Sequence, residues 1–111
     1  VRIDCNNHNL ILVADTNNSR ISIWSADGSQ LIRLVALESR PYSLVVDHFG
    51  RVVTGMGHVV CVYDSRNFDK IQSFGSEGLN PGQFRWTSGM CVTDDNTLVV
   101  VDFSNHSIQM F

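Results

Sequence analysis

Two stretches of this chain repeat one pattern at a constant spacing, and this repeat constrains the fold more than any other feature. Residues 13–24 (VADTNNSRISIW) return as residues 100–111 (VVDFSNHSIQMF), and the two copies align without a gap at an offset of 87 residues, from position 15 to position 102. Each copy has an apolar strand, an Asp-x-x-Asn turn, an alternating strand and a closing aromatic residue. A repeat of this kind predicts an array of similar structural units.

A third, degenerate copy lies between these two. It consists of residues 41–50 (PYSLVVDHFG) followed by the strand-like Val59–Tyr63. Met56-Gly57-His58 replaces the Asp-x-x-Asn turn in this copy, and the turn is two residues shorter. The closing aromatic residues of the three copies are Trp24, Tyr63 and Phe111, which are separated by 39 and 48 residues. The average period is therefore about 43.5 residues, within the range of propeller repeats.

Short strand-like runs separated by turn signals fill the whole chain. We predict strands at residues 10–14, 21–24, 31–35, 44–46, 52–53, 59–63, 71–74, 90–92, 98–101 and 108–111. Four short strands in a unit of this length are typical of a β-propeller blade. The prediction is a single all-β domain over residues 1–111, with repeats at about 1–40, 41–86 and 87–111. With a further first strand at residues 3–6, these repeats form about 2.6 four-stranded antiparallel blades, and the eleven strands are grouped four, four and three. Since closed propellers have about four to eight blades, we expect a fragment of a longer propeller.

The motifs of the three copies resemble the NHL repeat. The resemblance rests on residues 15–21 (DTNNSRI), 41–50 (PYSLVVDHFG) and 75–84 (GSEGLNPGQF), and Asn105-His106 keeps two letters of the Asn-His-Leu turn that names the repeat. It covers essentially the whole chain, although Ser107 stands where the first copy has Arg20. The resemblance implies a six-bladed propeller like the C-terminal domain of tripartite-motif proteins, which carry RING and B-box modules.

The Asp-x-x-Asn turns bring two oxygen-bearing side chains together, as a metal site would. We interpret them as blade scaffolding, because Asp and Asn side chains hydrogen-bond their own turn backbone and tolerate left-handed conformations. We also predict that Arg20 pairs with the turn carboxylate of a neighbouring blade. The predicted structural turn residues are Asp15, Asn18, Arg20, Asp102 and Asn105.

No residues of the sequence are spaced as metal ligands or as a catalytic set. His8, His48, His58 and His106 fall in predicted loops without the spacing of a ligand pair. No Ser/His/Asp arrangement, Gly-rich phosphate loop or paired-carboxylate pattern stands out. We therefore predict no catalytic residues, no metal and no cofactor.

Loops of a four-stranded antiparallel blade gather at two ends, because the chain reverses direction with each strand. The first loop face takes the turns between strands two and three and the connections to the next blade. It is predicted to carry Arg20, Arg40, Tyr42, His58, Arg85, Trp86, Phe103 and His106, with acids at Asp15, Glu38, Glu77 and Asp102. The second loop face takes the remaining turns and carries Asp27, Asp47, Asp64, Asp69, Asp94 and Asp95 against Arg51 and Arg66.

The first loop face has the composition of a binding surface. Arginine with tryptophan and tyrosine is typical of partner-binding surfaces, and aromatic rings with arginine planes also stack the bases of single-stranded RNA. Our candidate partner-binding residues are Arg40, Tyr42, Arg85, Trp86, Phe103 and His106. The alternative is that Trp86 and Phe103 only cap the blades.

We expect a non-catalytic scaffold that binds a protein or single-stranded RNA. Protein is favoured, because the formal net charge is −3 and Lys70 is the single lysine. The resemblance implies the target-recognition part of a tripartite-motif ubiquitin ligase, with any ligase activity in an N-terminal RING module outside this sequence. Two other classes stay open. One is a metal-dependent lyase or lactonase propeller, and the other is an extracellular or sensor propeller. The second is open because Asn17-Asn18-Ser19 and Asn105-His106-Ser107 are formal glycosylation sites.

Cysteine usage and hydropathy bear on where the protein works. Cys5, Cys61 and Cys91 are an odd number of cysteines without a C-x-x-C spacing, so we predict three reduced thiols. Reduced thiols favour an intracellular, cytoplasmic location. No apolar run approaches 18 residues, and we expect no membrane contact.

Overall fold

The computed structural model describes residues 2–5 and 10–111, with side chains from residue 10 onward. Its strands form three antiparallel sheets, which we name blades 1 to 3. Blade 1 contains β1 (Arg2–Cys5), β2 (Ile11–Asp15), β3 (Arg20–Trp24) and β4 (Leu31–Ala36). Blade 2 contains β5 (Ser43–Val46), β6 (Val52–Gly55), β7 (Val60–Tyr63) and β8 (Lys70–Phe74). Blade 3 contains β9 (Thr87–Val92), β10 (Leu98–Asp102) and β11 (Ser107–Met110).

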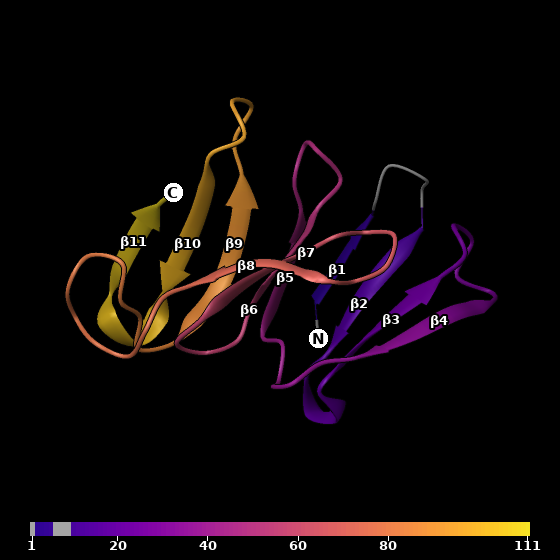
Figure 1. The fold of residues 1–111 in the computed structure, drawn as a ribbon, viewed down its shortest axis with the longest axis horizontal. Coiled ribbons are helices and arrows are strands. Elements are labelled where there is room, and N and C mark those ends of the chain that lie inside the picture. Colours follow the sequence, from indigo (N-terminus) through magenta and orange to yellow (C-terminus); the bar gives the residue numbers. More distant parts are fainter. Residues whose placement is uncertain (1, 6–9) are drawn as a thin grey trace.

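The three blades lie side by side in chain order (Figure 1). Within each blade the strands pair in sequence order, so each blade is a simple meander. The first strand of the middle blade, β5, contacts both β1 and β9, which are the first strands of its neighbours. First strands that meet in this way are the inner strands of propeller blades. The predicted fold class is confirmed: the described part of the chain is a partial propeller of four, four and three strands.

The middle blade is buried on both faces, and this explains its unbroken apolar sequence. Alternate residues of a strand point to opposite sides of the sheet. Val52 and Cys61 therefore pack toward blade 1, whereas Val53 and Val62 pack toward blade 3. The interface of blades 1 and 2 also contains Leu12, Ala14, Ile21, Ile23, Val35, Leu44, Met56 and Tyr63. The interface of blades 2 and 3 also contains Val60, Phe84, Leu98 and Val100. Each fully buried Val, Leu, Ile or Phe side chain contributes about 1.5–3 kcal/mol.

The shorter turn predicted for the middle copy is confirmed. The backbone N–H of Met56 donates to the Val59 carbonyl at 2.8 Å, so only two residues separate these partners. In blade 1 the paired residues are Asp15 and Arg20, with four residues between them. Met56 therefore occupies the position of the turn aspartate. Its thioether packs into the core at the place where the other copies have a carboxylate.

The Asp-x-x-Asn turns are single 3₁₀ turns, η1 (Thr16–Asn18) and η2 (Phe103–Asn105). The residue directly after each 3₁₀ turn has a left-handed backbone conformation: Ser19 (φ 50°) after η1 and His106 (φ 51°) after η2. Neither is an Asp or an Asn, which differs from the expectation that these two residue types take the left-handed positions.

The sequence predicted that the aspartate of the first turn bonds to its own turn backbone. In the structure it bonds to side chains instead. Asp15 Oδ2 accepts hydrogen bonds from Asn18 Nδ2 and Arg20 Nε, both at 2.9 Å. The prediction that Arg20 reaches a neighbouring blade is therefore wrong, because the pair closes within one turn. The hydrogen bond from Asn18 and the ion pair with Arg20 lower the pKa of the Asp15 carboxyl. In the second turn Asn105 Nδ2 reaches Ser107 Oγ at 3.5 Å.

Two of the three cysteines have described side chains, and both are free thiols. Cys61 is buried and Cys91 is exposed, and burial raises the pKa of the Cys61 thiol. The side chain of Cys5 lies outside the described residues. Among the described residues, no helix has the length and hydropathy needed to cross a membrane.

Candidate functional site

The loops of the three blades alternate between two ends, as antiparallel pairing requires. The first loop face consists of residues 16–19, 37–42, 56–59, 75–86 and 103–106. The second consists of residues 25–30, 47–51, 64–69 and 93–97, together with a β1–β2 connection that is not described. These assignments place each candidate binding residue on the first loop face, at connections into or within blades 2 and 3.

An aromatic group forms where the connections into blades 2 and 3 meet. The rings of Tyr42 and Trp86 have centroids 4.5 Å apart at an interplanar angle of 54°. His58 approaches the same indole edge-on, at 6.5 Å and 89°. Trp86 keeps 39% of its surface exposed, and Tyr42 and His58 are half-buried. We call Tyr42, His58 and Trp86 the aromatic cluster. Packing between rings at such distances adds about 0.5–1.5 kcal/mol beyond area burial and fixes ring orientation.

The short middle turn forms the floor of the aromatic cluster. Gly57 has φ 82°, a left-handed conformation that glycine adopts without strain. A Cβ atom at this position would lie 3.8 Å from the six-membered ring of Trp86, so the indole covers the turn. The Gly57 carbonyl also accepts the Thr87 N–H at 2.9 Å, which ties the turn to the start of β9.

Asp102 fixes the backbone from which Trp86 projects. Its side chain is fully buried, and its two oxygens accept the N–H groups of Arg85 and Trp86, each at 2.9 Å. The Trp86 carbonyl in turn accepts the N–H of Phe103 at 3.2 Å. Charge-assisted hydrogen bonds to backbone amides are about twice as strong as neutral ones. The indole is therefore presented by a restrained segment.

His58 is held between a carbonyl and a carboxylate. Its Nδ1 lies 3.2 Å from the Phe84 carbonyl, and its Nε2 lies 3.7 Å from Glu77 Oε2. A neutral ring donates Nδ1–H to the carbonyl, and a protonated ring also forms an ion pair with Glu77. The sequence placed His58 and Glu77 on this face without naming either as a candidate binding residue, and it did not point to Gly57. The loss of the Asp-x-x-Asn turn at Met56-Gly57-His58 was the available signal.

The other candidates are exposed residues of the same loop face. Arg40 and Arg85 are exposed next to Pro41 and Trp86. Phe103 is 70% exposed and joins the cluster through its backbone contact with Trp86. His106 is exposed at the far end of η2. The structure thus brings together Tyr42, His58 and Trp86 by ring contact and Arg85 and Phe103 by backbone contact.

Carboxylates of the second loop face bond mostly within their own turns. Asp47 Oδ2 pairs with Arg51 Nε at 2.6 Å, while its Oδ1 accepts the N–H groups of Phe49 and Arg51. Asp27 accepts the hydroxyls of Ser25 and Ser29, and these bonds lower its pKa to about 2. Glu38, in the β4–β5 connection, pairs with Lys70 at the start of β8 at 2.6 Å and raises the pKa of that lysine. Most of these acids therefore serve turn geometry.

Metal ligands do not converge in the described part of the chain. Over residues 10–111, no three His, Cys, Asp or Glu side chains lie close enough to share an ion. His48 is exposed on the second loop face, and His58 and His106 lie on the first. His8, the fourth histidine of the sequence, lies outside the described residues.

Comparison with known proteins agrees with this architecture. Residues 84–111, which include the anchored tryptophan and all of blade 3, match the NHL repeat family. The chain is an arc of a β-propeller. No curated protein sequence matches it.

Solved propellers superpose on nearly the whole arc at low sequence identity. A protein of unknown function from Bacteroides caccae gives a TM-score of 0.76 at 17% identity, over 95% of this chain and 39% of its own. A catalytically inactive virginiamycin B lyase from Staphylococcus aureus, solved with quinupristin, gives 0.74 at 13%, over 98% and 39%. The WD40 propeller domain of Doa1 gives 0.72 at 13%, over 93% and 33%.

These likenesses establish the fold alone. The chain spans about two fifths or less of each of these three solved structures, so the remainder of each of those proteins has no counterpart in this chain. The three neighbours are a protein of unknown function, a lyase and a WD40 domain, and one fold can support unrelated functions. The function of this arc has to be argued from its own residues.

Proposed function

We propose that this propeller arc belongs to a non-catalytic scaffold whose first loop face recruits a protein or RNA partner. The observation that carries the proposal is the aromatic cluster, in which a partly exposed indole is held against Tyr42 and His58. Tryptophan, tyrosine and arginine are the residues that contribute most at interfaces. A ring already fixed by packing and by Asp102 loses little conformational entropy when a partner binds.

A protein partner is favoured over RNA on this face. Arg40 and Arg85 flank the cluster, but Glu38 and Glu77 lie on the same face, and the chain carries a formal net charge of −3. Affinity for nucleic acid depends strongly on phosphate neutralisation by basic residues, and this face supplies few of them. The proposal includes a cytoplasmic role as the target-recognition part of a tripartite-motif ubiquitin-ligase-like protein. Any ligase chemistry would then reside in another module.

The test compares aromatic residues on the two loop faces of the full protein. Trp86→Ala and the triple variant Arg40→Ala/Arg85→Ala/Trp86→Ala are expected to weaken partner binding by about 10- to 100-fold, since a central hot spot is worth about 2 kcal/mol or more. Phe49→Ala is the matched control, because Phe49 is an exposed aromatic residue of the second loop face. Partners are captured by photo-crosslinking from position 104, an exposed serine of the same face, and affinities are then measured with the purified partner.

Unchanged affinity in the triple variant would overturn the proposal. Binding of an unstructured oligonucleotide, measured by fluorescence anisotropy with the same variants, decides between protein and RNA. The competing enzyme hypothesis predicts a stoichiometric calcium or zinc ion in the complete propeller, which elemental analysis detects. The extracellular hypothesis predicts glycans at Asn17 or Asn105, which mass spectrometry of the natively expressed protein detects.

A further inference from the structure

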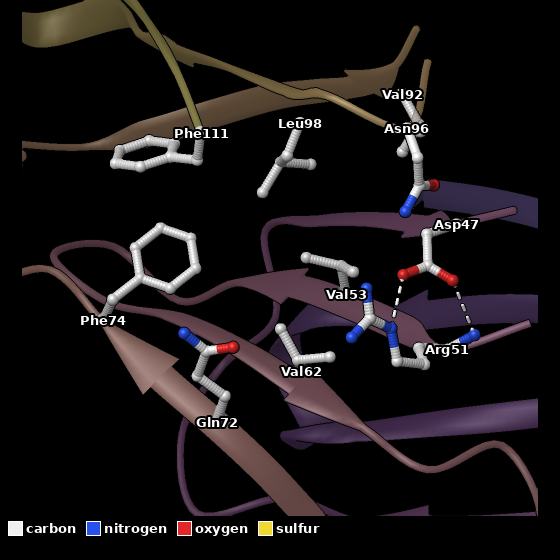
Figure 2. Close-up of a pocket in the computed structure, with 10 residues that line it drawn as sticks. All are labelled: Asp47, Arg51, Val53, Val62, Gln72, Phe74, Val92, Asn96, Leu98 and Phe111. Atoms are coloured by element: carbon white, nitrogen blue, oxygen red, sulfur yellow. Dashed lines mark hydrogen bonds and ion pairs between the residues drawn. The ribbon is translucent and has the colours of Figure 1, made fainter. Parts of the chain in front are cut away.

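A cavity of about 200 Å³ lies between blades 2 and 3, and none of its lining residues belongs to the aromatic cluster. Figure 2 shows its two contrasting ends: Asp47, Arg51 and Asn96 lie at one end, and the rings of Phe74 and Phe111 lie at the other. Between them the walls are aliphatic, formed by Val53, Val62 and Leu98. The cavity therefore has an apolar body with a charged end at Arg51, and Gln72 adds an amide on the Phe74 side (Figure 2). An apolar body with a few polar groups is the general design of small-molecule sites.

The polar end is preformed by contacts between the two blades. Asn96, in the β9–β10 turn, accepts the N–H of His48 in the β5–β6 turn at 2.9 Å. Asp47 is buried, and its carboxylate accepts two backbone N–H groups and Arg51 Nε. This end of the cavity is held by hydrogen bonds and does not depend on a ligand to form.

The guanidinium of Arg51 lies over the Phe49 ring, with Cζ 5.3 Å from the ring centroid, and its outer edge makes no hydrogen bond among the described residues. Only Nε contacts Asp47, and over the described residues neither terminal nitrogen has a hydrogen-bonding partner. Figure 2 shows these terminal nitrogens directed away from Asp47, toward Val53 and Val62. Two parallel N–H donors on one guanidinium edge match the two oxygens of a carboxylate. The nearby Asp95 bonds within its own turn, to Thr93 and Thr97.

The volume sets the size of the apolar group. A cavity of about 150 Å³ lined by aliphatic and aromatic side chains takes up a benzene ring. About 200 Å³ therefore accommodates one ring or a short alkyl chain together with a carboxylate. The paired rings of Phe74 and Phe111, with centroids 4.7 Å apart, favour contact with an aromatic group.

We propose that the cavity between blades 2 and 3 binds a small aryl carboxylate, with the carboxylate on the Arg51 guanidinium and the ring against Val53, Val62 and Leu98. This site is separate from the first loop face, so neither proposal depends on the other. A ligand there also bridges the two blades, and it is expected to stabilise their interface in proportion to its occupancy.

The experiment titrates phenylacetate and its neutral analogue phenylacetamide into the full chain and follows the methyl signals by NMR. Phenylacetate is expected to shift the Val62 and Leu98 methyls with a Kd of the order of 1 mM, and phenylacetamide to bind at least about tenfold more weakly. The Trp86 indole signal, on the other face, stays unmoved. Equal affinity for the two compounds, no saturable shift of these methyls, or shifts centred on Trp86 overturns the proposal.

Variants separate the guanidinium from its charge. Arg51→Gln is expected to abolish the preference for phenylacetate, while Arg51→Lys, which keeps the charge beside Asp47, retains only part of it. Val62→Phe fills the cavity and is expected to exclude both compounds. The matched control is Arg66→Gln, because Arg66 is an exposed arginine of the same face outside the cavity. Should Arg51→Gln not fold, Arg51→Lys and Val62→Phe still decide: undiminished phenylacetate binding in both contradicts the assignment.

Discussion

The buried carboxylate of Asp102 holds the backbone N–H of Trp86 at 2.9 Å, and so joins the repeat motif to the surface that the repeat supports. The same carboxylate accepts the N–H of Arg85. Because both bonds go to backbone N–H groups, the tryptophan ring is not involved in them and packs against Tyr42. A residue of the repeat motif and two residues of the candidate binding face are thus linked by two hydrogen bonds.

Removal of this carboxylate is expected to destabilise the protein and loosen the aromatic cluster. Asp102→Ala leaves two partly buried backbone donors without an acceptor, which costs about 2–3 kcal/mol. Asp102→Asn keeps one acceptor oxygen and costs less. Denaturant titration measures the loss, and indole fluorescence of a Trp24→Phe background reports on Trp86. Asp94→Ala, an exposed carboxylate of the second loop face, is the control. Equal stability of the Asp102 and Asp94 variants contradicts the prediction.

Gly55 is predicted to be intolerant of even one methyl group. A Cβ atom there would lie 2.3 Å from Ser43 Oγ and 2.7 Å from Thr87 Oγ1, two buried hydroxyls at the starts of β5 and β9. Gly55→Ala is expected to cost about 1–3 kcal/mol, because a packed interior resists added volume.

A matched glycine provides the control for this change. Gly89, in the neighbouring strand β9, has open space around the corresponding position, so Gly89→Ala is expected to be close to neutral. The unfolding midpoints of the two variants are compared by thermal denaturation. A Gly55 variant as stable as the Gly89 variant would show that the Ser43 and Thr87 hydroxyls move aside freely.

Asp27 makes a specific contribution to acid stability. The Ser25 hydroxyl and the Ser29 amide and hydroxyl hold the pKa of its carboxyl at about 2, below the unfolded value of about 3.9. A group with a lowered pKa stabilises the fold fully above its unfolded pKa, and this stabilisation is lost as the pH falls through the folded pKa. The contribution of Asp27 therefore disappears between about pH 4 and pH 2.

Titration of the Asp27 carboxyl carbon by NMR checks this prediction directly. The double variant Ser25→Ala/Ser29→Ala removes the donors and is expected to return the pKa of Asp27 toward 3.9. In Asp27→Asn the difference in unfolding midpoint between pH 4 and pH 2 is expected to shrink. A carboxyl that titrates near pH 4 in the unchanged protein refutes the assignment.

The repeat made the propeller arc predictable from the sequence. The reason why the middle copy lacks the Asp-x-x-Asn turn is seen only in the structure. Period and alternation are local properties of the sequence, so the grouping of strands follows from them. Whether a copy requires the turn aspartate depends on which backbone N–H groups the connection into that blade leaves without an acceptor. Pro41 has no backbone N–H to donate, and the Tyr42 N–H goes to the Gly55 carbonyl, so Met56 can replace a carboxylate at no loss.

The composition of the first loop face was predictable from the sequence, whereas the contacts between its residues were not. Antiparallel reversal is enough to place Tyr42 and Trp86 on one loop face, since each loop type always falls at the same end of a blade. Which of those residues touch depends on the two-residue turn at Gly57 and on the Asp102 bonds to the next connection. The wrong partner for Arg20 has a similar cause, because a contact within a turn and one between turns have the same sequence pattern.

The free face of blade 3 is expected to drive self-association of the 111-residue chain. Val101 and Ile108 are cross-strand partners, as are Val99 and Met110, and Ile108 and Met110 are 67% and 72% exposed. Burial of such apolar pairs against another blade is favourable, whereas their exposure to water is unfavourable. Ile108→Lys/Met110→Lys is expected to weaken association at least about tenfold, measured by sedimentation equilibrium, because it places charge on the contact. Ala26→Lys/Gln30→Lys adds the same charge to an exposed loop and controls for net charge. A monodisperse monomer of 12.4 kDa with a cooperative thermal transition would contradict the expectation, and would mean that three blades bury enough surface to stand alone.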